Sequence, residues 1–98
     1  MLTKEEVIQA ISKTTHPEID DSLVDLGMVK DVRIEKEVVV VTLNLPFMGI
    51  PIKDELARIV TEAVANADQA SRAEVQYATM SEEERTEFMR KARERWKS

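Results

Sequence analysis

The 98-residue sequence predicts an α+β fold in two layers, with helices packed on one face of a small sheet. Three observations support this prediction. Apolar residues recur at helical spacing near the N-terminus, in the middle of the chain and near the C-terminus. Two runs rich in β-branched residues separate the first two helical patterns, and a shorter run follows the second. The order is therefore helix, strand, strand, helix, strand, helix, in which apolar helix stripes are buried against a sheet.

The first helix and the loop after it have clear boundaries in the sequence. Thr3 and Glu6 have the spacing of a capping box, which predicts a helix start. The residue before Pro17 is disfavoured in the α region, so the helix must end before this point. Residues 18–27 predict an ordered loop with buried apolar side chains. It ends at Gly27, where we expect a backbone geometry that only glycine adopts at low cost.

Residues 28–35 alternate between apolar and charged side chains, which predicts a half-buried strand. A turn at residues 35–37 follows, although it lacks the Asn-Gly or Asp-Gly pair of a tight hairpin. Residues 38–45 carry β-branched residues on both faces, so we expect the central strand here. Residues 73–77 predict a short third strand. The better-buried side of the central strand is expected to carry Val39, Val41, Leu43 and Leu45.

Two longer helices complete the chain. Residues 52–67 carry a continuous apolar stripe, and Pro51 suits the first helical position. Ser81 and Glu84 form a second capping box, which opens a helix that runs to about residue 96. We expect one domain over residues 1–98, with residues 78–98 as a C-terminal helical extension. This extension carries a narrow apolar seam of Phe88, Met89, Ala92 and Trp96.

Composition excludes several classes of protein. The chain has no cysteine, so it can supply no disulfide, no zinc ribbon and no thiolate-held iron–sulfur cluster. A net charge of −5 argues against binding to nucleic acid or to an anionic membrane. No apolar run approaches the length of a membrane helix, and the N-terminal residues do not resemble a signal peptide. We therefore expect a cytoplasmic protein.

Several blocks of the sequence carry a family resemblance. His16-Pro17-Glu18 is followed by Ser-Leu-Val-Asp-Leu-Gly-Met-Val at residues 22–29, then by a hairpin, a proline-rich loop and a long helix. This pattern resembles the PaaD/SufT-like family of metal–sulfur (iron–sulfur) cluster assembly proteins. The same domain opens many Mrp-type iron–sulfur carrier ATPases. The resemblance covers essentially the whole chain and implies the α+β fold of that family.

Two departures from the family pattern change what the resemblance implies. His16 stands where the family has aspartate, and Ile50 stands where the family loop has cysteine. A thiolate before a helix N-terminus can hold iron, a cluster or a persulfide, whereas isoleucine cannot. The resemblance therefore implies a non-enzymatic accessory or adaptor protein in cluster assembly or metalloenzyme maturation. Its partners would be cluster-assembly or client metalloproteins, and iron or a cluster would associate only through them.

The loop at residues 46–51 is the first candidate site. Its residues Phe47, Met48, Gly49, Ile50 and Pro51 join the central strand to the long helix. The apolar side chains among them either fold inward as a lid on the core or present a patch to a partner protein. We expect a partner-binding role for this loop.

The segment of residues 16–27, called the acidic loop below, provides further candidates. Glu18 and Asp25 match acidic positions of the family motif. The Asp25 carboxylate either acts near the 46–51 loop or, part-buried, accepts backbone hydrogen bonds and shapes its own loop. His16 with Glu18, Asp20 and Asp21 is either an Fe(II) or Zn(II) site or a helix-stop loop.

The alternatives to an adaptor are therefore a metal-binding protein or small metal-dependent enzyme that uses His16 and nearby carboxylates, and a structural oligomer subunit. The second would pair through the apolar seam as a homodimer. No nucleophile arrangement and no glycine-rich phosphate loop is present in the sequence, so we predict a protein that is not an enzyme.

Overall fold

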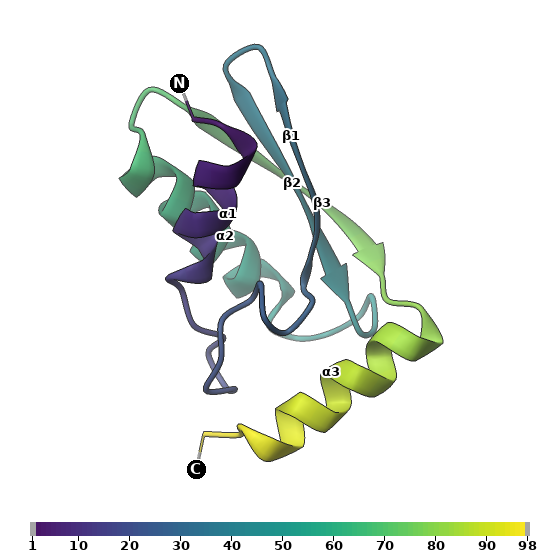
Figure 1. Cartoon of the computed structure of the whole chain (residues 1–98). Coiled ribbons are helices and arrows are strands. Elements are labelled where there is room, and N and C mark those ends of the chain that lie inside the picture. The colour runs from purple at the N-terminus through teal and green to yellow at the C-terminus, as the bar shows by residue number, and fades with distance from the viewer. Residues whose placement is uncertain (1, 98) are drawn as a thin grey trace.

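The computed structural model describes residues 2–97 and has the predicted order of elements (Figure 1). The fold is α+β, as the sequence predicts. No helix in these residues is both long and apolar enough to cross a membrane. The elements are α1 (Lys4–Ser12), β1 (Val29–Glu35), β2 (Val38–Leu45), α2 (Lys53–Ala67), β3 (Arg72–Thr79) and α3 (Glu82–Glu94).

The three strands form one sheet in the order β1-β2-β3, so the apolar strand β2 is central, as predicted. β1 and β2 form an antiparallel hairpin, while β3 runs parallel to β2 after the crossover through α2. Val41 of β2 pairs with Val32 of β1 and Val75 of β3. β3 is longer than the predicted 73–77, because its pairing with β2 continues at both ends.

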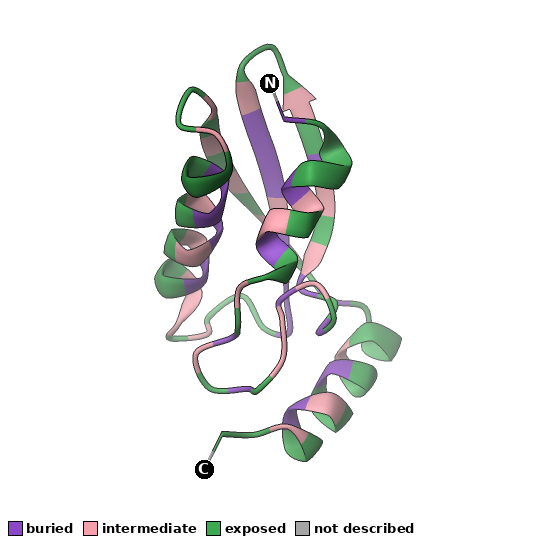
Figure 2. Ribbon diagram, turned by 60° about the vertical axis from the view of Figure 1, so that its left-hand side comes forward, coloured by how far each residue is buried: buried purple, intermediate pink, exposed green. Residues whose placement is uncertain are grey.

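The core lies between the sheet and the pair of helices α1 and α2, which cover one face of it (Figures 1 and 2). The four residues predicted for the better-buried side of β2 are at most 1% exposed. The opposite side of β2 is also largely covered, and there Val40 and Asn44 are buried. The sequence pattern did not reveal Asn44, because a polar residue on the outer face of a sheet normally contacts solvent.

Both predicted capping boxes are present, at Thr3 with Glu6 and at Ser81 with Glu84. The prediction for α2 was wrong at its first residue. Pro51 lies in a turn before the helix, Ile52 is the N-cap without a side-chain cap, and the helix begins at Lys53. The Lys53 amide donates to the Ile50 carbonyl at 3.3 Å, so the chain makes a tight turn before the first helical residue.

Two positions have a left-handed backbone. Gly27 has φ 75°, which confirms the geometry expected at the end of the acidic loop. Lys36 has φ 59° in the two-residue turn between β1 and β2. A side chain with a Cβ adopts this region at a cost, and Lys36 therefore stands where Gly or Asn is usual.

Candidate functional site

A groove of about 280 Å³ lies where α3 crosses the end of the two layers. It brings together three segments that are distant in sequence: the start of the acidic loop, the 46–51 loop, and α3 with the residues that follow it. Its volume suits one or two side chains rather than a whole drug-sized ligand. The lining residues are mostly apolar: His16, Glu18, Ile19, Met28, Pro46, Ile50, Pro51, Ile52, Phe88, Met89, Ala92 and Trp96.

The 46–51 loop forms one wall of the groove and also extends beyond it. Ile50 is half-buried against the core, so this side chain faces the groove. Phe47 and Met48 are 54% and 46% exposed, and Gly49 is exposed beside them. The guanidinium of Arg85 from α3 lies over the Phe47 ring, 5.2 Å from its centroid. The loop is divided between the two arrangements expected for it: Ile50 packs inward against the core, while Phe47 and Met48 face outward.

His16 lies at the floor of the groove and is 3% exposed. Its Nδ1 accepts a hydrogen bond of 2.9 Å from the Glu18 amide, so the neutral ring carries its proton on Nε2. Burial lowers the pKa of His16, and Lys97 adds to this effect, while Glu18 and Glu55 oppose it. The imidazole is therefore neutral at pH 7 and uses one nitrogen to hold the loop.

The predicted acids do not converge on this histidine. Glu18 is exposed at the edge of the groove, and Asp25 is not among its lining residues. The sequence left two roles open for the Asp25 carboxylate, one near the 46–51 loop and one part-buried in its own loop; the residue is exposed and lies outside the groove. Val24 and Leu26 turn toward the core, so Asp25 between them points to solvent, while Lys91 binds its backbone carbonyl at 2.7 Å. Within residues 2–97, no three His, Cys, Asp or Glu side chains are grouped to hold a metal.

The C-terminal end of α3 is fastened to the acidic loop. Arg95 pairs with the Asp21 carboxylate, whose side chain is only 11% exposed. Burial would raise the pKa of Asp21, but the Ser22 amide and the Arg95 guanidinium outweigh burial and lower it. Backbone bonds add to this attachment: the Asp20 amide donates to Arg95 at 2.6 Å, and the Lys97 amide donates to Glu18 at 3.0 Å.

Sequence reasoning missed that α3 is part of this site. The seam was recognised, but its two possible uses could not be separated. Phe88 and Ala92 are buried against the domain, whereas Met89 and Trp96 are 43% and 55% exposed. The seam is therefore divided between docking and an open surface. α3 follows β3, and β3 pairs with β2, which leads into the 46–51 loop. The strand order therefore brings α3 close to this loop, and knowledge of that order would have indicated the groove.

A family model described as iron–sulfur cluster assembly protein matches residues 4–77, which is three quarters of the chain. The chain belongs to the iron–sulfur cluster assembly protein family. The matched region runs from α1 into β3 and ends before α3. The family assignment agrees with the resemblance that the motifs at residues 16–29 and the 46–51 loop indicate.

Curated relatives of this iron–sulfur cluster assembly family member are longer proteins. An iron–sulfur cluster carrier protein of Mycobacterium leprae (strain TN) is 35% identical over 91 residues, covering 92% of this chain and 24% of the carrier. The carrier of Mycobacterium tuberculosis (strain ATCC 25618 / H37Rv) is 35% identical over 85 residues, covering 86% and 22%. The chain thus spans about a quarter of the length of the curated relatives it matches.

Solved structures share the fold. A domain of unknown function from Bacillus anthracis superposes with a TM-score of 0.72 at 20% identity, covering 83% of this chain and 81% of that one. A conserved hypothetical protein from Thermotoga maritima gives 0.67 at 25% identity, covering 89% and 94%. A Mycobacterium tuberculosis protein associated with iron–sulfur complex assembly and repair gives 0.53 at 21% identity, covering 79% and 68%.

Proposed function

We propose that this chain is a non-enzymatic adaptor in iron–sulfur cluster assembly or metalloenzyme maturation. It acts by protein contact through the 46–51 loop and the groove beside it. The observation that carries this proposal is the exposed Phe47–Met48 pair at the edge of a groove with mostly apolar lining. Aromatic and methionine side chains are enriched at protein interfaces, and exposed apolar patches mark contact sites.

The residues of this chain do not fit a resident iron–sulfur cluster. Such clusters are held by thiolates, with histidine as an occasional substitute, and the chain has no cysteine. His16 contributes one nitrogen to the groove, since Nδ1 is occupied by the Glu18 amide. The cluster is therefore a cargo handled by partner proteins. The same geometry does not favour the alternative of a metal site built from His16, Glu18 and Asp25, because Asp25 lies outside the groove.

The partners in this proposal are cluster-assembly proteins or client metalloproteins in the cytoplasm. We further propose that residues 1–98 act as one domain, with residues 78–98 as a helical extension. The attachment of α3 to the acidic loop through Asp21 and Arg95 supports this. Release of α3 from an otherwise resistant domain by limited proteolysis would argue against a single unit. Recovery of the protein outside the cytoplasmic fraction would argue against the location.

The test combines association with a cellular readout. The native chain is co-purified with candidate cluster-assembly proteins of the same cell, and activities of iron–sulfur enzymes are measured in cells from which its gene is deleted. We expect association and reduced enzyme activity on deletion. A Phe47→Ser/Met48→Ser variant should not associate and should not restore enzyme activity in the deletion cells, because it removes the apolar contact without adding charge.

Gln69→Ser is the matched control, since Gln69 is exposed in the α2–β3 loop, outside the groove. Thermal denaturation of all variants confirms that they are folded. A wild-type chain that does not associate with these proteins, together with unchanged enzyme activities on deletion, would overturn the adaptor function. Full association of the Phe47→Ser/Met48→Ser variant would instead show that the contact lies elsewhere.

A further inference from the structure

α3 carries a second stripe on the flank beside the one that docks on the domain. Glu82, Thr86, Met89 and Arg93 recur at alternating spacings of four and three residues, and the exposed Trp96 follows beyond the helix end, where the chain forms a bridge with Ile19. This is the spacing of the contact seam between two paired helices. Every member is exposed, and Met89 and Trp96 are two of the large apolar side chains that the domain leaves open.

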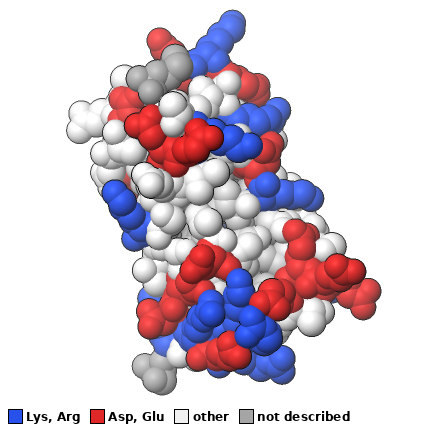
Figure 3. Space-filling view, viewed as in Figure 1, with Lys and Arg blue, Asp and Glu red and all other residues white. Residues whose placement is uncertain are grey.

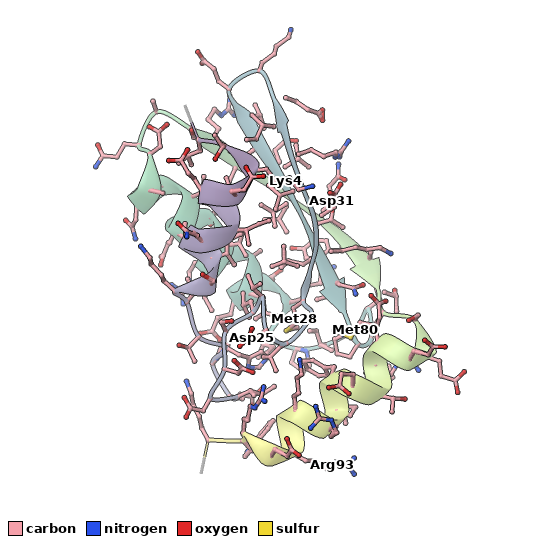
Figure 4. The ribbon with its side chains drawn as sticks, viewed as in Figure 1. Lys4, Asp25, Met28, Asp31, Met80 and Arg93 are labelled. Carbon is pink, nitrogen blue, oxygen red and sulfur yellow. The ribbon has the colours of Figure 1, made fainter. Side chains whose placement is uncertain are left out.

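The charges of this stripe are unused within the domain, whereas most other cations of this region have a partner. Arg90 pairs with Glu87 and Glu94 on its own helix. Lys91, Arg95 and Lys97 bind the acidic loop, and Arg85 lies over Phe47. Among residues 2–97, the side chains of Glu82 and Arg93 make no hydrogen bond or ion pair. Arg93 lies at the outer edge of α3 (Figure 4).

The stripe is complementary to itself when reversed. Its acidic end is at the start of α3, where Figure 3 shows acidic side chains gathered at the lower right, and its cation is at the other end. In an antiparallel pair with the two-fold axis between Thr86 and Met89, Glu82 faces Arg93 of the second copy. Thr86 then faces Met89 of the second copy. Each contact occurs twice, as a two-fold interface requires.

We propose that two copies of this chain associate through antiparallel pairing of their α3 stripes. The occupant of the stripe is a second copy because one surface supplies both halves of each charge pair. This inference does not rest on the adaptor function, since it needs no client, although Met89 and Trp96 also line the groove. A single helix pair is a small interface, so the dimer is expected to form in the micromolar range rather than at nanomolar concentration.

The test is sedimentation equilibrium of the full chain over about 10 µM to about 1 mM, a range suited to a small interface. The wild type is expected to show a reversible monomer–dimer equilibrium. Arg93→Glu and Glu82→Lys should each raise the dissociation constant at least about tenfold, because each change places two repulsive pairs in every dimer. The double variant Arg93→Glu/Glu82→Lys should restore dimerisation to near the wild-type constant.

Two matched controls carry the same charge changes outside the stripe. Glu74→Lys and Arg72→Glu alter exposed positions of β3, away from α3. Both should dimerise like the wild type. Trp96→Glu should weaken the dimer, with circular dichroism confirming an intact fold. A wild type that remains monomeric at about 1 mM would overturn the proposal, and so would a double variant no tighter than the single ones.

Discussion

The ion pair between Asp21 and Arg95 should determine how firmly α3 is held against the acidic loop. Replacing Asp21 with Asn keeps the oxygen that accepts from the Ser22 amide at 2.8 Å but removes the charge. The Asp21 side chain is 11% exposed and that of Arg95 is 39% exposed, so the pair lies between the exposed and buried cases. We expect Asp21→Asn to lower the free energy of unfolding by about 1–2 kcal/mol.

A double-mutant cycle isolates the pair. The variants are Asp21→Asn, Arg95→Met and their combination, and the expected coupling energy is about 1 kcal/mol. Urea unfolding is followed by the fluorescence of Trp96, the only tryptophan, which lies next to Arg95. The matched control is Arg58→Met with Glu62→Gln, an exposed pair on α2 that should couple by about 0.3–0.5 kcal/mol.

The coupling should also depend on pH. The pKa of Asp21 is lowered in the folded protein, so the contribution of its charged form to the free energy of unfolding is present above the unfolded pKa of about 3.9. It is lost as the pH falls through the folded value. A coupling below about 0.3 kcal/mol at about pH 7 would be within the error of additivity and would refute this account of α3 attachment. A coupling that does not weaken in acid would refute it as well.

Three further predictions follow from single residues. Burial lowers the pKa of His16, so the folded state favours the neutral ring. The contribution of His16 to the free energy of unfolding is therefore present above about pH 6.5 and is lost as the pH falls below that value. His16→Asn keeps an acceptor for the Glu18 amide and should remove this loss in urea unfolding at about pH 7.5 and 5.5; an unchanged pH dependence would contradict the buried neutral ring. The variants Ile50→Cys and Met48→Cys each place one cysteine in the chain. The cysteine at position 50 should react several-fold more slowly with a thiol reagent than the one at position 48, because Ile50 is half-buried. Equal rates would show that the whole loop is open to solvent. Lys36→Gly should raise the free energy of unfolding by about 0.5–1 kcal/mol and Lys36→Val should lower it, since Lys36 has a left-handed backbone. Thermal denaturation of both variants tests this prediction. A glycine variant less stable than the wild type would contradict it.

Much of the fold could be predicted because its signals are local. The capping boxes at Thr3 and Ser81, the glycine geometry at Gly27 and the alternation along the strands each depend on neighbours within a few residues. The start of α2 was less predictable, because Pro51 fits both a first helical turn and the tight turn that precedes it. The central position of β2 followed from its β-branched residues on both faces.

The candidate site was predictable only in part. The composition established that the chain has no thiolate, and the motifs indicated His16 and the 46–51 loop as places of interest. Whether Phe47 faces the core or solvent depends on how the loop leaves the sheet, which no spacing encodes. The same holds for Asp25, whose direction is set by the burial of Val24 and Leu26 on either side of it.

By itself, the sequence determined the α+β class, the order of the elements and the absence of a thiolate at Ile50, because periodicity, capping and residue identity are properties of short segments. Only the tertiary structure decided that His16, Ile50 and α3 share one groove, since these segments meet through strand order and helix packing. It also decided the division of α3, which buries Phe88 and leaves Met89 and Trp96 open. Which flank of a helix is buried depends on the segment that it packs against, and the whole fold determines which segment that is.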